Sequence, residues 1–295
     1  MTPARLRRYG PLLSLGAGLT VGGCYPGVLH PAGPVAAGER TILLNSLVIM
    51  LAIVIPTIIA TILFAWWFRA GNTRATYRPT WSYSGRLELL VWSVPLLVVI
   101  FLGGIAWIGS HDLEPRKPLA SNQRALTVEV VSLDWKWLFI YPEQGVASIN
   151  RLVIPAGRPV RFRITSGTVM NSFFVPRLGS QIYAMSGMET SLYLQADRPG
   201  RYRGISAHYS GAGFPDMHFV VDSVTPARFA GWAVQARAGQ GPVLDASAYL
   251  ALAKRSAASG IVTFRAAQPR LFDAIVKQSG APVQETQSGG REDRR

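Results

Sequence analysis

Two long apolar runs dominate the first third of the chain, at residues 42–68 and 87–108. Each is long enough to cross a bilayer as a helix, which takes about 20 apolar residues. The segment between them, residues 69–86, carries four arginines and no acidic residue. Basic loops stay in the cytoplasm, so both outer flanks of the pair lie on the opposite side. The pattern predicts a hairpin of two transmembrane helices over residues 41–109.

The residues ahead of the hairpin form a basic start followed by a short apolar stretch, which is typical of a secretory signal over residues 1–23. The signal ends at Cys24 in a sequence that resembles a bacterial lipobox, so we expect cleavage there and lipid on the Cys24 sulfur. An ordinary free cysteine in an uncleaved anchor is the alternative. Residues 24–40 are rich in Pro, Gly and Ala and are interpreted as a linker. Because Cys24 is the only cysteine, an intrachain disulfide and a multi-cysteine metal site are both excluded.

Beyond the hairpin, short segments with strand character alternate with turn signals, beginning near Leu126. Several short strands at such spacing predict a β-sandwich or barrel over residues 110–224. After Pro226 the pattern becomes helical through residue 278, and Asp245 is placed to cap a helix that begins at the next residue. Residues 279–295 are polar, and we expect them to be a disordered tail.

The net charge of the chain does not change the predicted organisation. The chain has 30 basic and 16 acidic residues, a formal net charge of +14. Such a balance can indicate nucleic-acid binding. Here the basic residues are scattered, and several of them flank the two apolar runs, where they orient the hairpin. We therefore expect no nucleic-acid partner.

Three motifs carry a family resemblance: residues 131–137, 169–176 and 209–217. They resemble the cupredoxin domain of subunit II of haem-copper terminal oxidases, and the bo-type ubiquinol oxidases in particular. The hairpin and the lipobox match that family too. The resemblance implies a membrane α-hairpin with two transmembrane helices plus an all-β cupredoxin-like sandwich, with a small C-terminal helical extension.

In the cytochrome c oxidases of this group, two bridging cysteine thiolates, two histidines, a methionine and a backbone carbonyl hold two coppers. The matching positions in this chain are Asn171, Ser206, His208, Ser210, Phe214 and Met217. Serines stand at both thiolate positions, and only Met217 keeps a ligand of the right type, although soft thiolates are what hold copper in such sites. We predict a vestigial site without metal. A single copper on His208, Met217 and His218 is disfavoured, because successive strand residues point to opposite faces.

Three further residues are candidates for a role. Glu88 lies just inside the second apolar run, where a buried acid is costly and is a functional hypothesis by default. In the family a matching glutamate lies at the mouth of a proton channel of subunit I, so we predict proton entry at Glu88; an interfacial glutamate without a role is the alternative. Trp135 and Trp137 match the aromatic stretch that receives electrons in the cytochrome c enzymes. Without copper, we interpret them as packing or docking residues.

The resemblance also implies the function. The complex would oxidise ubiquinol, reduce oxygen to water and pump protons in the bacterial inner membrane, with the large domain of this chain in the periplasm. Haems and one copper are expected in subunit I, which would also bind the ubiquinol, and no cofactor and no catalytic residue in this chain. Subunits I, III and IV and membrane lipid are the expected partners. The alternatives are a copper-bearing cytochrome c oxidase subunit II and a free-standing lipoprotein with a cupredoxin-like module.

Overall fold

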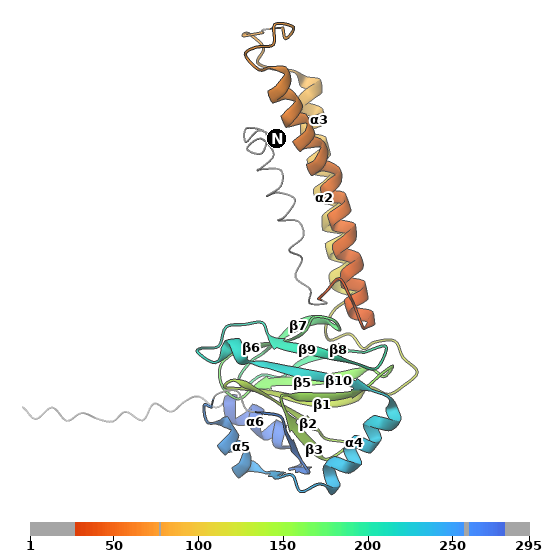
Figure 1. Ribbon diagram of the computed structural model, residues 1–295, viewed down its shortest axis with the longest axis vertical. Coiled ribbons are helices and arrows are strands. Elements are labelled where there is room, and N and C mark those ends of the chain that lie inside the picture. The colour runs from red at the N-terminus through yellow and green to blue at the C-terminus, as the bar shows by residue number, and fades with distance from the viewer. Residues whose placement is uncertain (1–26, 77, 257–259, 281–295) are drawn as a thin grey trace, which may run out of the picture.

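The computed structural model describes residues 27–76, 78–256 and 260–280. Two long helices, α2 (Pro34–Trp67) and α3 (Gly85–Asp112), stand on a β-sandwich (Figure 1). Both are apolar and long enough to cross a membrane, and the window of highest hydropathy in each is unburied by the rest of the chain. The predicted hairpin is confirmed. The predicted signal over residues 1–23 and Cys24 lie outside the described residues.

The linker predicted over residues 24–40 is wrong from Pro34 onward, because α2 begins there. Proline suits the first turn of a helix, where its missing N–H has no intrahelical partner to lose. The alanines that follow, which we interpreted as linker composition, are strong helix formers. At 34 residues, α2 is about 51 Å long, roughly 20 Å more than the apolar core of a bilayer. Its first turns therefore extend beyond the membrane core to the sandwich.

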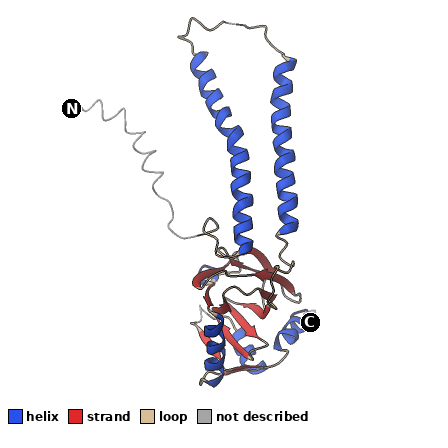
Figure 2. Ribbon diagram, turned by 90° about the vertical axis from the view of Figure 1, so that its right-hand side faces the viewer, coloured by secondary structure: helices blue, strands red, loops and turns tan. Residues whose placement is uncertain are grey.

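The two helices are closest near the sandwich and farther apart at the connecting loop (Figure 2). Gly109 lies against Ile42 at the close end, where a side chain on the glycine would collide with the isoleucine. The start of α2 is fixed to the sandwich by backbone hydrogen bonds. Ala32 N–H donates to the Arg177 carbonyl at 2.7 Å, and Ala36 N–H donates to the Leu178 carbonyl at 3.2 Å. The hairpin and the sandwich thus share one connected structure.

Ten consecutive strands form most of the sandwich: β1 (Leu126–Leu133), β2 (Lys136–Tyr141), β3 (Val146–Ile149), β4 (Arg151–Pro155), β5 (Val160–Ser166), β6 (Asn171–Val175), β7 (Gly179–Ala184), β8 (Thr190–Leu194), β9 (Gly200–Ser206) and β10 (His218–Val224). One sheet has the order β12-β3-β2-β1-β5-β8, in which the edge strand β12 (Val262–Phe264) comes from the C-terminal region. The other sheet has the order β4-β10-β9-β6-β7. The pairs β1–β5 and β4–β10 are parallel, and the other pairings among these ten strands are antiparallel. The predicted all-β sandwich is confirmed.

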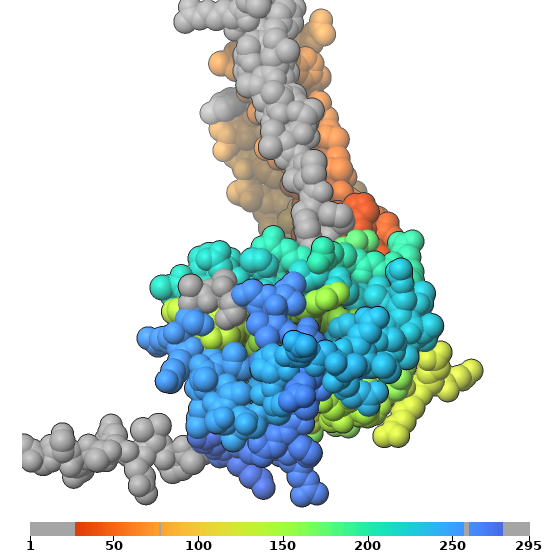
Figure 3. Space-filling view, turned by 60° about the horizontal axis from the view of Figure 1, so that its bottom comes forward, coloured from red at the N-terminus to blue at the C-terminus, as the bar shows by residue number. Residues whose placement is uncertain are grey.

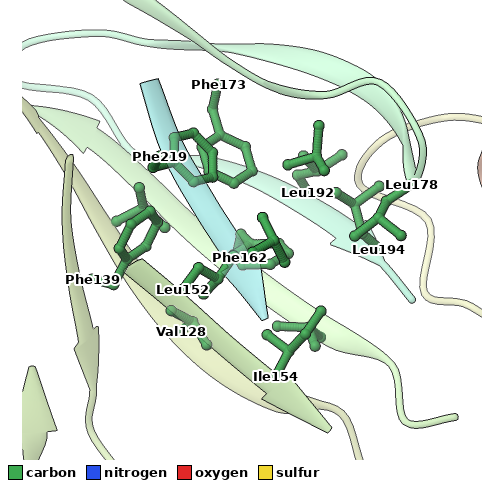
Figure 4. Close-up of a cluster of buried hydrophobic side chains, with 14 of the residues drawn as sticks. Val128, Phe139, Leu152, Ile154, Phe162, Phe173, Leu178, Leu192, Leu194 and Phe219 are labelled. Atoms are coloured by element: carbon green, nitrogen blue, oxygen red, sulfur yellow. The ribbon is translucent and has the colours of Figure 1, made fainter. Parts of the chain in front are cut away.

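Aromatic and aliphatic side chains fill the space between the two sheets (Figure 4). Phe173 is central: its ring lies 5.1 Å from Phe219 in its own sheet and 5.3 Å from Phe162 in the other, measured between ring centroids. All three are buried. Burial of such aromatic groups is the main favourable term in folding.

The C-terminal region packs against the sandwich, and its part from Leu244 to Ile275 covers the outer face of the six-stranded sheet (Figure 3). It contains α4 (Pro226–Ala238), β11 (Val243–Leu244), α5 (Ala246–Ala253), β12 (Val262–Phe264), β13 (Ala266–Ala267) and α6 (Leu271–Gly280). The helices were expected, and Asp245 caps α5 through a 2.8 Å hydrogen bond from the Ala248 N–H. A purely helical region over 225–278 was wrong, because β12 pairs with the edge of β3. The last helix runs from Leu271 to Gly280, past the predicted start of the tail at 279.

Candidate functional site

The fold brings the positions predicted to be a vestigial copper site together at one end of the five-stranded sheet. Asn171 opens β6 and Ser206 closes β9, and these two strands are paired. The loop after β9 carries His208 and Ser210, and a 3₁₀ turn, Phe214–Asp216, leads to Met217. The Ser206 N–H donates to the Met217 carbonyl at 3.1 Å, which closes the loop at its base.

Hydrogen bonds within the chain connect these positions. The Ser206 hydroxyl lies 3.1 Å from Asn171 Oδ1 and 3.3 Å from the His208 carbonyl oxygen, and it can donate to either. Asn171 Nδ2 in turn donates to the Val169 carbonyl at 3.2 Å. Asn171 and Ser206 are buried, and buried polar groups need such partners. Ser206 thus gives the Asn171 amide oxygen a hydrogen-bond partner and contacts the His208 carbonyl oxygen, one of the positions predicted to match a copper ligand.

The remaining positions pack in a similar way. The Ser210 hydroxyl lies 3.8 Å from the Met217 sulfur, and Met217 is 2% exposed within the core. The ring of Phe214 lies edge-on to Tyr209, with centroids 5.6 Å apart. Amide, hydroxyl and phenyl groups therefore stand where soft ligands would be required. These residues do not fit a two-copper centre, because a serine hydroxyl is neutral at physiological pH and does not bridge metals as a thiolate does.

The histidines near this site do not converge on a metal position. The ring of His208 packs edge-on against Tyr183, with centroids 5.9 Å apart. Met217 is buried whereas His218 is exposed at the start of β10, so their side chains point apart as strand alternation predicts. Within the described ranges there is no cluster of three or more His, Cys, Asp or Glu side chains that could hold a metal ion.

The two tryptophans have packing roles. Trp137 is fully buried in the core, with its ring 5.5 Å from Phe173 and 5.6 Å from Phe219. Trp135 is half-buried and donates from its ring nitrogen to the Ser210 carbonyl at 2.9 Å. The ring lies against Gly213, where there is no room for a side chain. Trp135 therefore braces the loop that carries the vestigial site, and Trp137 is not available to a partner.

Similar proteins identify the family. The chain is 46% identical to ubiquinol oxidase subunit 2 of Acetobacter aceti over 289 residues, which are 97% of this chain and 92% of that protein. It is 45% identical to cytochrome bo(3) ubiquinol oxidase subunit 2 of Pseudomonas aeruginosa, over 90% of this chain and 80% of that one. The chain belongs to the ubiquinol oxidase subunit 2 family. Residues 143–224 also match the family described as cytochrome c oxidase subunit II, periplasmic domain, which identifies the sandwich as cupredoxin-like.

Solved structures are also similar to this chain, at lower sequence identity. The periplasmic domain of subunit II of cytochrome oxidase from Bradyrhizobium japonicum is 23% identical to this chain, with a TM-score of 0.37. The match covers 39% of this chain and 96% of that domain.

Glu88, where we predicted that protons enter, lies in the first turn of α3 and is exposed. α3 begins at the end of the hairpin farthest from the sandwich (Figure 2), so its first turn, with Glu88, lies at that end. The backbone N–H of Glu88 donates to the Ser84 carbonyl at 3.0 Å, which starts the helix. The structure thus separates Glu88 from the vestigial copper site by the full length of α3.

An ion-pair cluster around Arg163 escaped the sequence analysis. The guanidinium binds Glu129 at 2.7 Å, Glu189 at 2.7 Å and Asp273 at 2.8 Å, and it lies over the ring of Phe272. Burial raises the pKa of Glu129 above its ordinary value, and the charge of Arg163 opposes that rise. Apolar and polar residues alternate over residues 160–164, so Arg163 is expected on the face of β5 that points away from the core. No local signal indicates that three carboxylates from distant segments meet it there.

A second unpredicted contact joins the hairpin to the sandwich. The Glu39 carboxylate accepts hydrogen bonds from the Ser180 backbone N–H at 2.8 Å and from the Ser180 hydroxyl at 2.7 Å. Glu39 lies in α2 and Ser180 in β7, so one side chain fixes the helix to the edge of the sheet. We refer to these two residues as the Glu39–Ser180 clamp.

Proposed function

We propose that this chain is subunit II of a proton-pumping ubiquinol oxidase of the aerobic respiratory chain. In such a complex ubiquinol is oxidised and oxygen is reduced to water. The observation that carries the proposal is the hydrogen bond from the Ser206 hydroxyl to Asn171 Oδ1, at two positions that would otherwise supply copper ligands. A subunit that received electrons from a soluble cytochrome would need that metal. The similarity to ubiquinol oxidase subunit 2 over nearly the whole chain supports the same conclusion.

The role of the chain in the complex is then structural rather than catalytic. Haems and the remaining copper are assigned to subunit I, together with the ubiquinol site, and subunits III and IV complete the assembly. The two apolar helices and the match to a periplasmic domain family support a place for the hairpin in the bacterial inner membrane and for the sandwich in the periplasm. Cys24 would add an acyl anchor, which we infer from the preceding sequence alone. The intact mass of the mature chain tests this: a chain that begins at Met1 without lipid would contradict it.

Glu88 is proposed as a proton-entry group for subunit I. Its support is an acidic side chain in the first turn of an apolar helix, on the side that the arginine-rich loop assigns to the cytoplasm. A carboxylate at this height can take up protons from the cytoplasm and pass them to a neighbouring subunit.

Oxygen uptake tests the function directly. The purified complex should consume oxygen with ubiquinol as the donor and show no comparable rate with reduced cytochrome c. A chain that copurifies without haem would instead be a free-standing module. Faster uptake with cytochrome c than with ubiquinol would contradict the proposal.

Metal analysis tests the vestigial site. The unmodified chain, freed of other subunits, should bind no copper tightly. Because the strands already bring the positions together, four substitutions with Met217 left in place should allow a two-copper centre to form. They are Asn171→His, Ser206→Cys, Ser210→Cys and Phe214→His. Stoichiometric copper in the unmodified chain, lost on Met217→Leu, would show that the native site is active.

A further inference from the structure

A pocket lies where the hairpin meets the sandwich. Its volume is about 200 Å³. The first turn of α2, the end of α3 with the segment that follows it, and strands β7 and β8 form its walls. Residues that line it include Val35, Asp112, Leu113, Lys117, Ser180 and Tyr193. We refer to it as the junction pocket.

The walls of the junction pocket are fixed by hydrogen bonds. The Tyr193 N–H donates to the Pro115 carbonyl at 2.9 Å, which ties the segment after α3 to β8. The Lys117 N–H donates to the Glu114 carbonyl at 3.0 Å and closes a turn in that segment. The Glu39–Ser180 clamp holds the opposite wall. The pocket is therefore preformed in this chain, and binding there requires little ordering of the walls.

The height of the pocket places it in the headgroup layer of the bilayer. The apolar run of α3 ends at residue 108, and Asp112 follows four residues later, about 6 Å along the helix. The polar layer on each side of a bilayer is about 5–7 Å thick beyond the apolar core. Charged groups at this position thus meet phospholipid headgroups rather than bulk solvent.

The charges and the walls select the kind of headgroup. Lys117 Nζ and Asp112 Oδ1 are 3.7 Å apart on the rim, and Glu114 adds a second carboxylate. Both side chains of the pair are more than half exposed, so each can turn toward another ion of opposite charge. Val35 and Leu113 also line the pocket and offer apolar surface to methylene groups. A phosphate beside an ammonium, joined to acyl chains, complements this arrangement.

We propose that the junction pocket binds one zwitterionic aminophospholipid, with its phosphate on Lys117 and its ammonium on Asp112 and Glu114. The volume corresponds to about seven water molecules of the bulk liquid, which suits a headgroup and excludes a peptide helix. A headgroup that carries only negative charge would be attracted by one ammonium group and repelled by two carboxylates. A trimethylated amine has no N–H to donate to them. The inference requires only that the hairpin spans a membrane, and it is independent of the proposed oxidase function.

The test uses the full-length chain, purified in detergent and washed free of lipid. Native mass spectrometry would count bound lipid during titration with dihexanoyl phosphatidylethanolamine, phosphatidylcholine and phosphatidylglycerol. We expect one phosphatidylethanolamine per chain, bound about tenfold more tightly than either other lipid. The double variant Asp112→Asn with Lys117→Gln should lose about tenfold in affinity. Arg116→Gln removes a neighbouring cation that does not line the pocket, and it should bind as the unmodified chain does.

Three results would overturn the assignment. Equal or tighter binding of phosphatidylglycerol would contradict the charge argument. Unchanged affinity in the double variant, or an equal loss in Arg116→Gln, would place the lipid elsewhere. Binding of free phosphoethanolamine as tight as that of the short-chain lipid would show a site for a soluble ion, because the acyl chains would then contribute nothing.

Discussion

Replacing Arg163 by methionine should destabilise the soluble domain through one buried carboxylate. Methionine keeps the length of the side chain but removes the charge that Glu129 requires. The side chain of Glu129 is 10% exposed, and removing one partner of a buried ion pair costs about 3–5 kcal/mol. The pairs with Glu189 and Asp273 are partly exposed and contribute about 0.5 kcal/mol each after screening by solvent. We expect a loss of about 4 kcal/mol, dominated by Glu129.

Urea unfolding of a fragment spanning residues 113–280, followed by tryptophan fluorescence, would measure this loss. For a domain of this size, about 4 kcal/mol corresponds to a fall of about 8–16 °C in Tm. Arg161→Met is the matched control, since Arg161 is exposed two residues earlier on the same strand. It should change the free energy of unfolding by less than about 0.5 kcal/mol. Adding Glu129→Gln to Arg163→Met should restore more than half of the loss, because no uncompensated charge then stays buried.

The pH dependence gives an independent check. Burial raises the folded-state pKa of Glu129 above its ordinary value of 4.5, and losing Arg163 removes the charge that opposes the rise. A carboxyl with a raised folded pKa is neutral in both states below 4.5, and its cost appears as pH climbs through the folded pKa. The difference between the variant and the unmodified domain should therefore be small near pH 4 and largest at neutral pH. A constant difference, or a neutral-pH loss below about 1.5 kcal/mol, would refute the reasoning.

Three other side chains can be tested by substitution. Ser206→Ala should cost about 1–3 kcal/mol in the same unfolding assay, because Asn171 loses a buried hydrogen-bond partner; an unchanged unfolding midpoint would show that the bond is unimportant. Glu39→Ala removes the acceptor of two hydrogen bonds from Ser180, so amide hydrogen exchange of the intact chain should rise at the start of β7, whereas Arg40→Ala should leave it unchanged. Glu88→Gln should slow oxygen uptake at normal subunit levels and Glu88→Asp should slow it less; equal turnover in all three would exclude proton entry at Glu88.

The hairpin could be predicted from sequence because a run of 20 apolar residues has few other physical explanations. The cap of α5 could also be predicted, since the Asp245 carboxylate accepts a hydrogen bond from a backbone N–H only three residues away. The start of α2 could not be predicted, because Pro34 and the alanines after it suit both a linker and a first helical turn. The strand β12 was missed because its three residues are too few to show a period.

The ion-pair cluster shows where sequence reasoning ends. Arg163 meets carboxylates that are 34, 26 and 110 residues away along the chain. Nothing local to any of the four residues indicates the others, because the meeting depends on how β1, β8 and α6 are placed around β5. The vestigial site was different: the resemblance supplied the positions, and the structure added the hydrogen bonds that now connect them.

The layer formed by the C-terminal region sets the shortest fragment that can remain soluble. The stretch that matches the periplasmic domain family stops at residue 224, whereas Phe264 and Phe272 cover Val131, Leu138 and Ile149 on the outside of the six-stranded sheet. A fragment cut at residue 224 would open this apolar face to water and leave β3 as a bare edge. Both defects favour pairing between copies. Expression boundaries taken from the family match alone would therefore yield aggregates, and the helical extension acts as a built-in solubilising cover.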